Sequence, residues 1–217
     1  MLPEIPKDSI IAVGDIHGCD VALERLLSLL IDLPNRVVFL GDYVDRGACS
    51  PRVIGLLIMA QLRRPDWVFL VGNHEVMLME DVRLNLPPFG DDSGYEQYVA
   101  IGGLPATHMR FIEGLEIFWE SESFLFVHGG IEGEIDKPVA EHTLDELTWS
   151  YTIHKGWAGK RIVRGHFVVR EPEQHSNHIN LDTGCVFEGW LSAGVLDDRT
   201  GDLKGSIQVD IGGIGVR

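Results

Sequence analysis

Five short motifs in this 217-residue chain place acidic, amide or imidazole side chains next to glycine, and each motif follows an apolar run. In chain order they are GDIHG (14–18), GDYVDRG (41–47), GNHE (72–75), HGG (128–130) and GH (165–166). Glycine beside such residues is typical of turns after strands, where a positive φ or a close backbone approach is needed. Because the carboxyl ends of parallel strands share one edge of a sheet, we expect these polar residues to converge there.

The converging side chains would offer oxygen and imidazole donors and no sulfur. The expected metal ligands are Asp15, His17, Asp42, Asn73, His128 and His166. Such a set suits Mn²⁺ best, with Fe or Zn²⁺ as alternatives, and its imidazoles argue against a purely Mg²⁺ or Ca²⁺ site. Six ligands are too many for one tetrahedral ion. We therefore expect two divalent ions, with Asp42 as the carboxylate that bridges them.

The rest of GDYVDRG adds an acid and a cation to this site. Asp45 is placed to orient a histidine, and His74 of GNHE is the expected partner. An imidazole held by a carboxylate is a suitable general acid for a leaving oxygen, because histidine titrates near neutral pH. Arg46 can direct its planar guanidinium at phosphate oxygens. The three residues predict phosphoester hydrolysis without a serine or cysteine nucleophile.

The elements that must position these motifs can be read from apolar periodicity. Strands are expected at 9–13, 36–40 and 67–71, and helices at 21–33, 51–62 and 76–84, which is a parallel βαβαβ pattern. A hairpin is expected at 117–128, a loop at 86–94, and further strands at 161–164, 179–182, 189–196 and 206–211. An α/β half followed by a strand-rich half predicts two packed sheets with helices outside, in one domain spanning 1–217.

Composition narrows the class of partner. The formal net charge is −15 and the pI is about 4.9, so a basic surface for nucleic acid is not expected. No leader segment or membrane-spanning run is recognisable, so no membrane partner is expected. Three cysteines without C-x-x-C spacing suggest neither a disulfide framework nor a thiolate zinc site, and favour a cytoplasmic location.

With these motifs in view, the chain resembles the phosphoprotein phosphatases among the calcineurin-like metallophosphoesterases, especially their compact bacterial and phage members. The motifs stand in the family's order across residues 14–166. The resemblance implies a four-layer αββα sandwich with two central mixed sheets, a dinuclear metal centre, and attack on a phosphomonoester by hydroxide bound to the metals. It assigns the first ion to Asp15, His17 and Asp42, and the second to Asp42, Asn73, His128 and His166. It also makes His74 with Asp45 the acid pair and Arg46 a phosphate contact.

The resemblance favours a serine/threonine phosphoprotein phosphatase, with phosphotyrosine a further substrate. Two departures bear on the substrate: Val71 stands where many members have arginine, and residues 131–160 contain no arginine. Lys155, Arg161 or Arg164 are candidate substitutes. Symmetrical bis(5'-nucleosyl)-tetraphosphatases share the framework and form the alternative, although they usually lack the equivalent of Asp45.

Two further alternatives do not require a catalytic site. A non-catalytic, metal-binding scaffold would be expected to have lost ligands, yet all six ligands and the acid pair are present. Alone, Asp15, Asp42 or Asn73 could serve as a helix N-cap. Nearby, Cys19 is more typical of packing than of a ligand, and Trp149, Ser150 and Trp157 could line a substrate rim or anchor the core.

Overall fold

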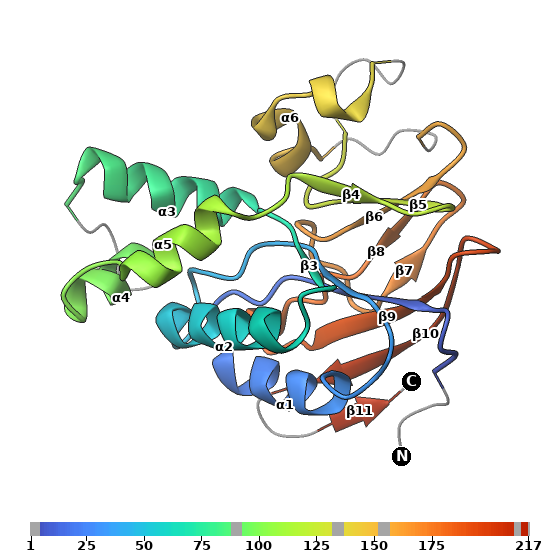
Figure 1. Ribbon diagram of the computed structural model, residues 1–217, viewed down its shortest axis with the longest axis horizontal. Coiled ribbons are helices and arrows are strands. Elements are labelled where there is room, and N and C mark those ends of the chain that lie inside the picture. The colour runs from blue at the N-terminus through green and yellow to red at the C-terminus, as the bar shows by residue number, and fades with distance from the viewer. Residues whose placement is uncertain (1–4, 88–92, 132–136, 152–156, 211–213, 217) are drawn as a thin grey trace.

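Two mixed β-sheets lie face to face at the centre of the computed structural model, which describes residues 5–87, 93–131, 137–151, 157–210 and 214–216 (Figure 1). The first sheet has the spatial order β11 (Ile214–Val216), β10 (Asp202–Val209), β9 (Leu191–Asp197), β1 (Ile10–Val13), β2 (Val37–Phe39) and β3 (Val68–Phe69). The second has the order β4 (Phe118–Glu120), β5 (Phe124–Val127), β6 (Arg161–Arg164), β8 (His178–Asn180) and β7 (Glu173–Gln174).

Each sheet contains three parallel strands, which form one end of the first sheet and the centre of the second. In the first sheet β1, β2 and β3 run parallel, while β9 pairs antiparallel with β1 and continues into the β10 and β11 ladder. In the second sheet β5, β6 and β8 run parallel, and β4 and β7 flank them antiparallel. The parallel strands of each sheet therefore end at a common edge, which is where the polar motifs begin.

Helices cover the outer faces of the two sheets. The helices are α1 (Asp20–Leu30), α2 (Ser50–Arg63), α3 (Asn73–Leu84), α4 (Gly94–Ala100), α5 (Ala106–Glu113) and α6 (Leu144–Thr148), with short 3-10 turns η1 (Val139–Glu141) and η2 (Cys185–Phe187). Figure 1 shows α1 and α2 on one side of the sheets and α6 beyond the other. No helix of the described residues is long and apolar enough to cross a membrane.

The two sheets and the helices outside them make four layers, and apolar side chains fill the three interfaces between these layers. Ile11 and Val13 of β1 pack with the helices of the first sheet, while Ile10 and Ala12 face the second sheet. A third cluster joins the outer face of β5 to α6. A strand covered on both faces must be apolar at every position, which explains the sequence IIAV. The αββα sandwich expected from the sequence is confirmed.

Several boundaries differ from the sequence expectation. Helix α3 begins at Asn73 rather than residue 76, because the Glu75 carboxylate accepts the backbone N–H of Gly72 at 3.0 Å and so caps the first turn. Strand β10 begins at Asp202 rather than residue 206. Helices α4, α5 and α6 and strands β7 and β11 were not predicted. The loop expected at 86–94 lies partly outside the described residues.

Gly14 directly follows β1, at a point where the backbone of Leu181 packs closely against it. A Cβ at Gly14 would lie 2.2 Å from the carbonyl oxygen of Leu181, which is backbone and cannot swing away. We expect Gly14→Ala to lower the free energy of unfolding by about 2–4 kcal/mol, as for other overpacked interiors. Urea denaturation would measure this change.

Gly55 in α2 is the matched control, since a Cβ there would meet nothing within 4 Å. Gly55→Ala should raise stability by about 0.5–1 kcal/mol through helix propensity. Equal effects of the two substitutions would contradict the close backbone approach at Gly14.

Candidate metal centre

The structure brings together all six residues expected to bind metal. Asp15 follows β1, Asp42 follows β2, Asn73 opens α3 after β3, and His128 directly follows β5. His166 follows β6, and its backbone N–H donates to both carboxylate oxygens of Asp15, at 3.0 and 3.2 Å. The two sheets therefore contribute to one cluster, which is buried apart from half-buried His166.

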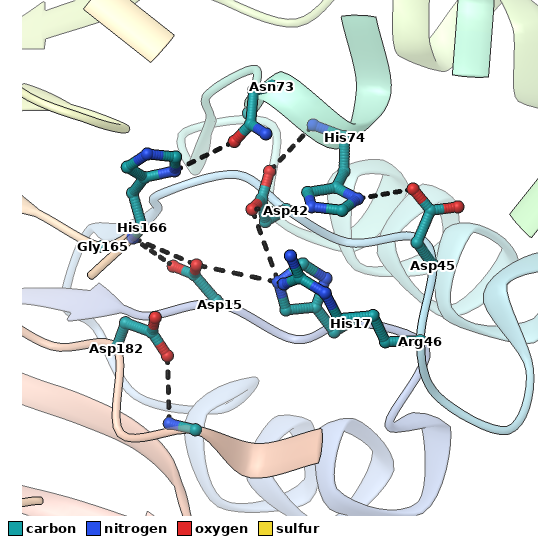
Figure 2. A network of polar contacts seen from close by, with 12 residues as sticks. Asp15, His17, Asp42, Asp45, Arg46, Asn73, His74, Gly165, His166 and Asp182 are labelled. Carbon is teal, nitrogen blue, oxygen red and sulfur yellow. Dashed lines mark hydrogen bonds and ion pairs between the residues drawn. The ribbon is translucent and has the colours of Figure 1, made fainter. Parts of the chain in front are cut away.

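Asp42 lies at the middle of the cluster (Figure 2). Its Oδ1 is 3.3 Å from His128 Nε2, and its Oδ2 is 3.4 Å from His17 Nε2. Two groups of residues are close enough to hold an ion each, one of His17, Asp42 and His74, the other of Asp42, His128 and His166. Asp42 belongs to both groups, so its carboxylate would be shared if each group held an ion.

Backbone carbonyls fix the orientation of two of the imidazoles. His17 Nδ1 lies 2.9 Å from Val44 O, and His128 Nδ1 lies 2.9 Å from Leu40 O. A ring N–H donated to a carbonyl leaves Nε2 facing the cluster with its lone pair, as is usual for histidines that bind metal.

An amide oxygen and an orphaned nitrogen complete the donor set. Asn73 Oδ1 lies 3.0 Å from His128 Nε2 and 3.0 Å from His166 Nδ1. The other ring nitrogen of His166, Nε2, is buried and has no hydrogen-bond partner among the described residues. Carboxylate, amide and imidazole acceptors that face one another in a buried space fit divalent cations.

The ionisable groups of the cluster shift one another's pKa values. Burial opposes the charged form of Asp42, but nearby His128, His17 and His74 outweigh burial and lower the pKa of Asp42. Burial likewise disfavours charge on His128, yet Asp42 raises the pKa of His128 to about 9. Burial lowers the pKa of His17 to about 4. A divalent cation bound at His128 would compete with a proton for the ring nitrogen that faces Asp42.

His74 and Asp45 meet beside the cluster, as the sequence predicts. His74 Nδ1 lies 2.5 Å from Asp45 Oδ2, and its Nε2 lies 4.0 Å from Asp42 Oδ2. The backbone N–H of Gly94 donates to the other oxygen of Asp45 at 2.6 Å. Asp45 is thus fixed by α4, and it holds one side of the His74 ring while the other side faces the cluster (Figure 2).

The cationic side chains that were expected to contact phosphate lie in different places. Arg46 Nη1 donates a hydrogen bond to His17 Nε2, so its guanidinium lies at the cluster. Arg161 instead bonds Gly201 O and Asp202, at the opposite end of β6, and is not part of the site. Arg164 is 2% exposed, and the charges of Asp15 and Asp182 act on its guanidinium, so it lies among the buried carboxylates beside the cluster. Lys155 lies outside the described residues.

Aromatic side chains stand next to His166. The ring of Trp149 lies 6.1 Å from that of His166, and the ring of Tyr151 lies 4.8 Å from it. Both are exposed and form a rim. Trp157 is instead buried in the apolar cluster between β5 and α6. It therefore anchors the core and does not line the rim.

Two carboxylates at the site were missed from the sequence. Glu75 is fully buried and accepts four backbone N–H groups, from Asp42 (2.9 Å), Tyr43 (2.8 Å), Val44 (3.1 Å) and Gly72 (3.0 Å). Asp182 is buried beside Asp15 and accepts the N–H of Gly184 at 3.0 Å. The signals were present: Glu75 is the fourth letter of GNHE, and Asp182 ends a predicted strand before Thr183 and Gly184.

The loops of the site are conformationally strained. Five of the eight non-glycine residues with positive φ among the described residues belong to the site: His17, Asp42, Asp45, Arg46 and His166. Such conformations cost about 1–3 kcal/mol each and persist where surrounding contacts enforce them. At Gly165 a side chain is excluded altogether, since a Cβ would lie 1.9 Å from Asp15 Oδ1.

Glu75→Gln tests the clamp on the Asp42 loop. An amide keeps one acceptor oxygen but turns an NH₂ group toward two of the four backbone donors. We expect a loss of about 2–5 kcal/mol in the free energy of unfolding, because buried donors are left unpaired, together with weaker metal binding. Urea denaturation and metal analysis after gel filtration would measure both.

Glu80→Gln is the matched control, because it makes the same change at an exposed position of the same helix. It should leave stability within about 0.5 kcal/mol of the parent. If the two variants lost the same stability, the role of Glu75 in holding the loop would be wrong.

The chain is similar to known proteins in both sequence and structure. A bis(5'-nucleosyl)-tetraphosphatase PrpE [asymmetrical] from Oceanobacillus iheyensis is 28% identical over 83% of this chain and 86% of its own length. Among solved structures, a candidate diadenosine tetraphosphatase has a TM-score of 0.70 and 23% identity, with 96% of both chains covered.

A protein serine/threonine phosphatase from Saccharomyces cerevisiae has a TM-score of 0.66 and 17% identity, covering 88% of this chain and 73% of its own. At these identities the two structural likenesses concern the fold. The family profile of the calcineurin-like phosphoesterases matches residues 9–190, which include every residue of the cluster. The chain therefore belongs to the calcineurin-like phosphoesterases.

Proposed function

We propose that this metallophosphoesterase hydrolyses bis(5'-nucleosyl) tetraphosphates. The position of Asp42 between two ligand groups is the observation that carries phosphoester hydrolysis. Relatives named as asymmetrical tetraphosphatases, at 26–28% identity over 83% of the chain, support the substrate. They shift the preference from the phosphoprotein substrate expected from the sequence to a dinucleotide, and from a symmetrical to an asymmetrical cut.

The proposed ligands follow the clusters described above. We assign Asp15, His17 and Asp42 to one ion and Asp42, Asn73, His128 and His166 to the other, with Mn²⁺ as the ion to load first. Bound there, two divalent ions would supply charge stabilisation for the phosphoryl oxygens and an activated water. The first assignment rests on Asp15 Oδ2, 4.0 Å from His17 Nε2, rather than on His74.

The chain itself handles the phosphate and the leaving oxygen. Arg46 holds a phosphate oxygen opposite the cluster, at the point where its guanidinium now contacts His17. The N-terminus of α3 faces the same space, since the His74 N–H donates to Asp42 Oδ1 at 3.1 Å. His74, fixed at Nδ1 by Asp45, gives a proton from Nε2 to the leaving oxygen.

A phosphoprotein substrate remains the second candidate, because the His74–Asp45 pair is intact. A serine or threonine leaves as an alkoxide, whose conjugate acid is about as weak as water, pKa about 15.7. A nucleotide leaves as a phosphate, whose second pKa is near 6. A strong proton donor is therefore essential for the first leaving group and dispensable for the second.

His74→Asn separates these requirements. On a phosphoserine peptide we expect kcat to fall by about 100-fold or more, the usual value of a general acid. On diadenosine tetraphosphate the fall should be less than about tenfold, for the same reason. Steady-state kinetics of both substrates with Mn²⁺ would measure the two ratios.

Metal content is the accompanying readout. It should be unchanged in His74→Asn, and His175→Asn, at a half-exposed surface histidine, should match the parent in every respect. Loss of one ion from His74→Asn would make His74 a ligand in place of Asp15.

The substrate itself is tested by comparing products. Metal-stripped protein reloaded with Mn²⁺ should cleave diadenosine tetraphosphate faster than a phosphoserine peptide at equal concentration. An off-centre cut gives ATP and AMP, whereas a central cut gives two molecules of ADP, and chromatography distinguishes them. Faster release of phosphate from the peptide would return the function to the second candidate and leave the metal cluster as described.

A further inference from the structure

A pocket lies next to the metal cluster, on the other side of the Arg46 side chain. It measures roughly 640 Å³ and is formed by the start of α1, the loop after β2 and the turn at η2. We call it the lateral pocket, and the residues that characterise it are Cys19, Val21, Arg46, Val186, Glu188 and Asp210. Its size falls within the roughly 300–1,000 Å³ typical of small-molecule sites.

Arg46 connects the lateral pocket to the cluster. Its Nη1 donates to His17 Nε2, while its side chain also lines the pocket. The Arg46 Cζ lies 5.8 Å from the centre of the Phe187 ring. A substrate whose phosphate meets Arg46 at the cluster therefore has its next group at the mouth of the lateral pocket.

The walls of the pocket favour an uncharged, aromatic group. Cys19 and Cys185 are buried, and Val21 and Val186 add aliphatic surface. Phe187 stands in the sequence between two residues of the lining, is 60% exposed, and has the Arg46 guanidinium over its ring. A flat exposed ring beside an apolar hollow is a stacking platform for a nucleobase.

The charges of the pocket disfavour a phosphate chain inside it. Asp20 pairs with Arg52, and Asp210 lies 3.8 Å from Arg25, so both carboxylates already have cations. Glu188 has no hydrogen bond or ion pair among the described residues, and it takes a left-handed conformation with φ of 60°. A free carboxylate repels phosphate but accepts hydrogen bonds from ribose hydroxyls.

We infer that the lateral pocket binds one nucleoside of the substrate, with Phe187 stacked on the base and Glu188 bonded to the ribose. This inference rests on the proposed dinucleotide function. Arg46 then marks the boundary between the phosphates at the cluster and the nucleoside in the pocket. The second nucleoside stays outside the pocket.

Phe187→Ala and Glu188→Gln test the pocket by catalysis, because both side chains are exposed and neither belongs to the cluster. For diadenosine tetraphosphate we expect KM to rise about tenfold in Phe187→Ala, with kcat changed less than about threefold. The KM for a phosphoserine peptide without aromatic residues, which has nothing to stack on Phe187, should not change. Leu62→Ala and Glu80→Gln, at exposed positions of α2 and α3, are the matched controls.

Direct binding separates this inference from the proposed function. Metal-free protein labelled with ¹⁵N would be titrated with adenosine, and the amide signals of Val21, Ala48, Val186 and Gly189 should shift. The shifts should be lost in Phe187→Ala. These shifts without hydrolysis of the tetraphosphate would overturn the proposed function and keep the pocket. Absence of the shifts, or an equal rise in KM for both substrates, would overturn the pocket even if the tetraphosphate is hydrolysed.

Discussion

The Asp42 carboxylate, buried among three imidazoles, is the constraint on which the rest of the site depends. A buried carboxylate stays charged only where positive charge or donors surround it. His128, His17 and His74 supply that environment, and the backbone N–H of His74 at the start of α3 adds to it. These partners come from three segments other than the loop of Asp42 itself. The position of one anion therefore fixes how β1, β2 and β5 end and where α3 begins.

Glu75 performs the corresponding task for the backbone. The loop that carries Asp42 turns with positive φ at Asp42, Asp45 and Arg46, and such a loop leaves its N–H groups without partners inside itself. Glu75 accepts three of them and ties the loop to the first turn of α3. Glu75 thereby holds in place the loop that carries Asp42, Asp45 and Arg46, although Glu75 itself contacts no substrate.

The sequence predicted the parts of the site that depend on strand order. Once β1, β2 and β3 are recognised as parallel, the convergence of Asp15, Asp42 and Asn73 follows from topology. Arg161 and Arg164 were harder, because side-chain direction at the two ends of one strand decides whether an arginine reaches the site. Glu75 and Asp182 bind backbone rather than ligands, so no spacing rule singled them out. Helices α4 and α5 are only seven and eight residues long, so their patterns are short, and core contacts such as Tyr98 of α4 and Phe111 of α5 define them.

Strand β1 illustrates what this architecture demands during synthesis. Its antiparallel partner is β9, where Leu196 pairs with Ile10. In the sequence β9 comes after every strand of the second sheet. Until β9 is made, one side of β1 has unpaired N–H and C=O groups on a strand that is apolar on both faces. Such an open edge is a template for aggregation. Pairing over so long a loop is also slow. This edge of β1 therefore stays open during synthesis until residues 191–197 have been made.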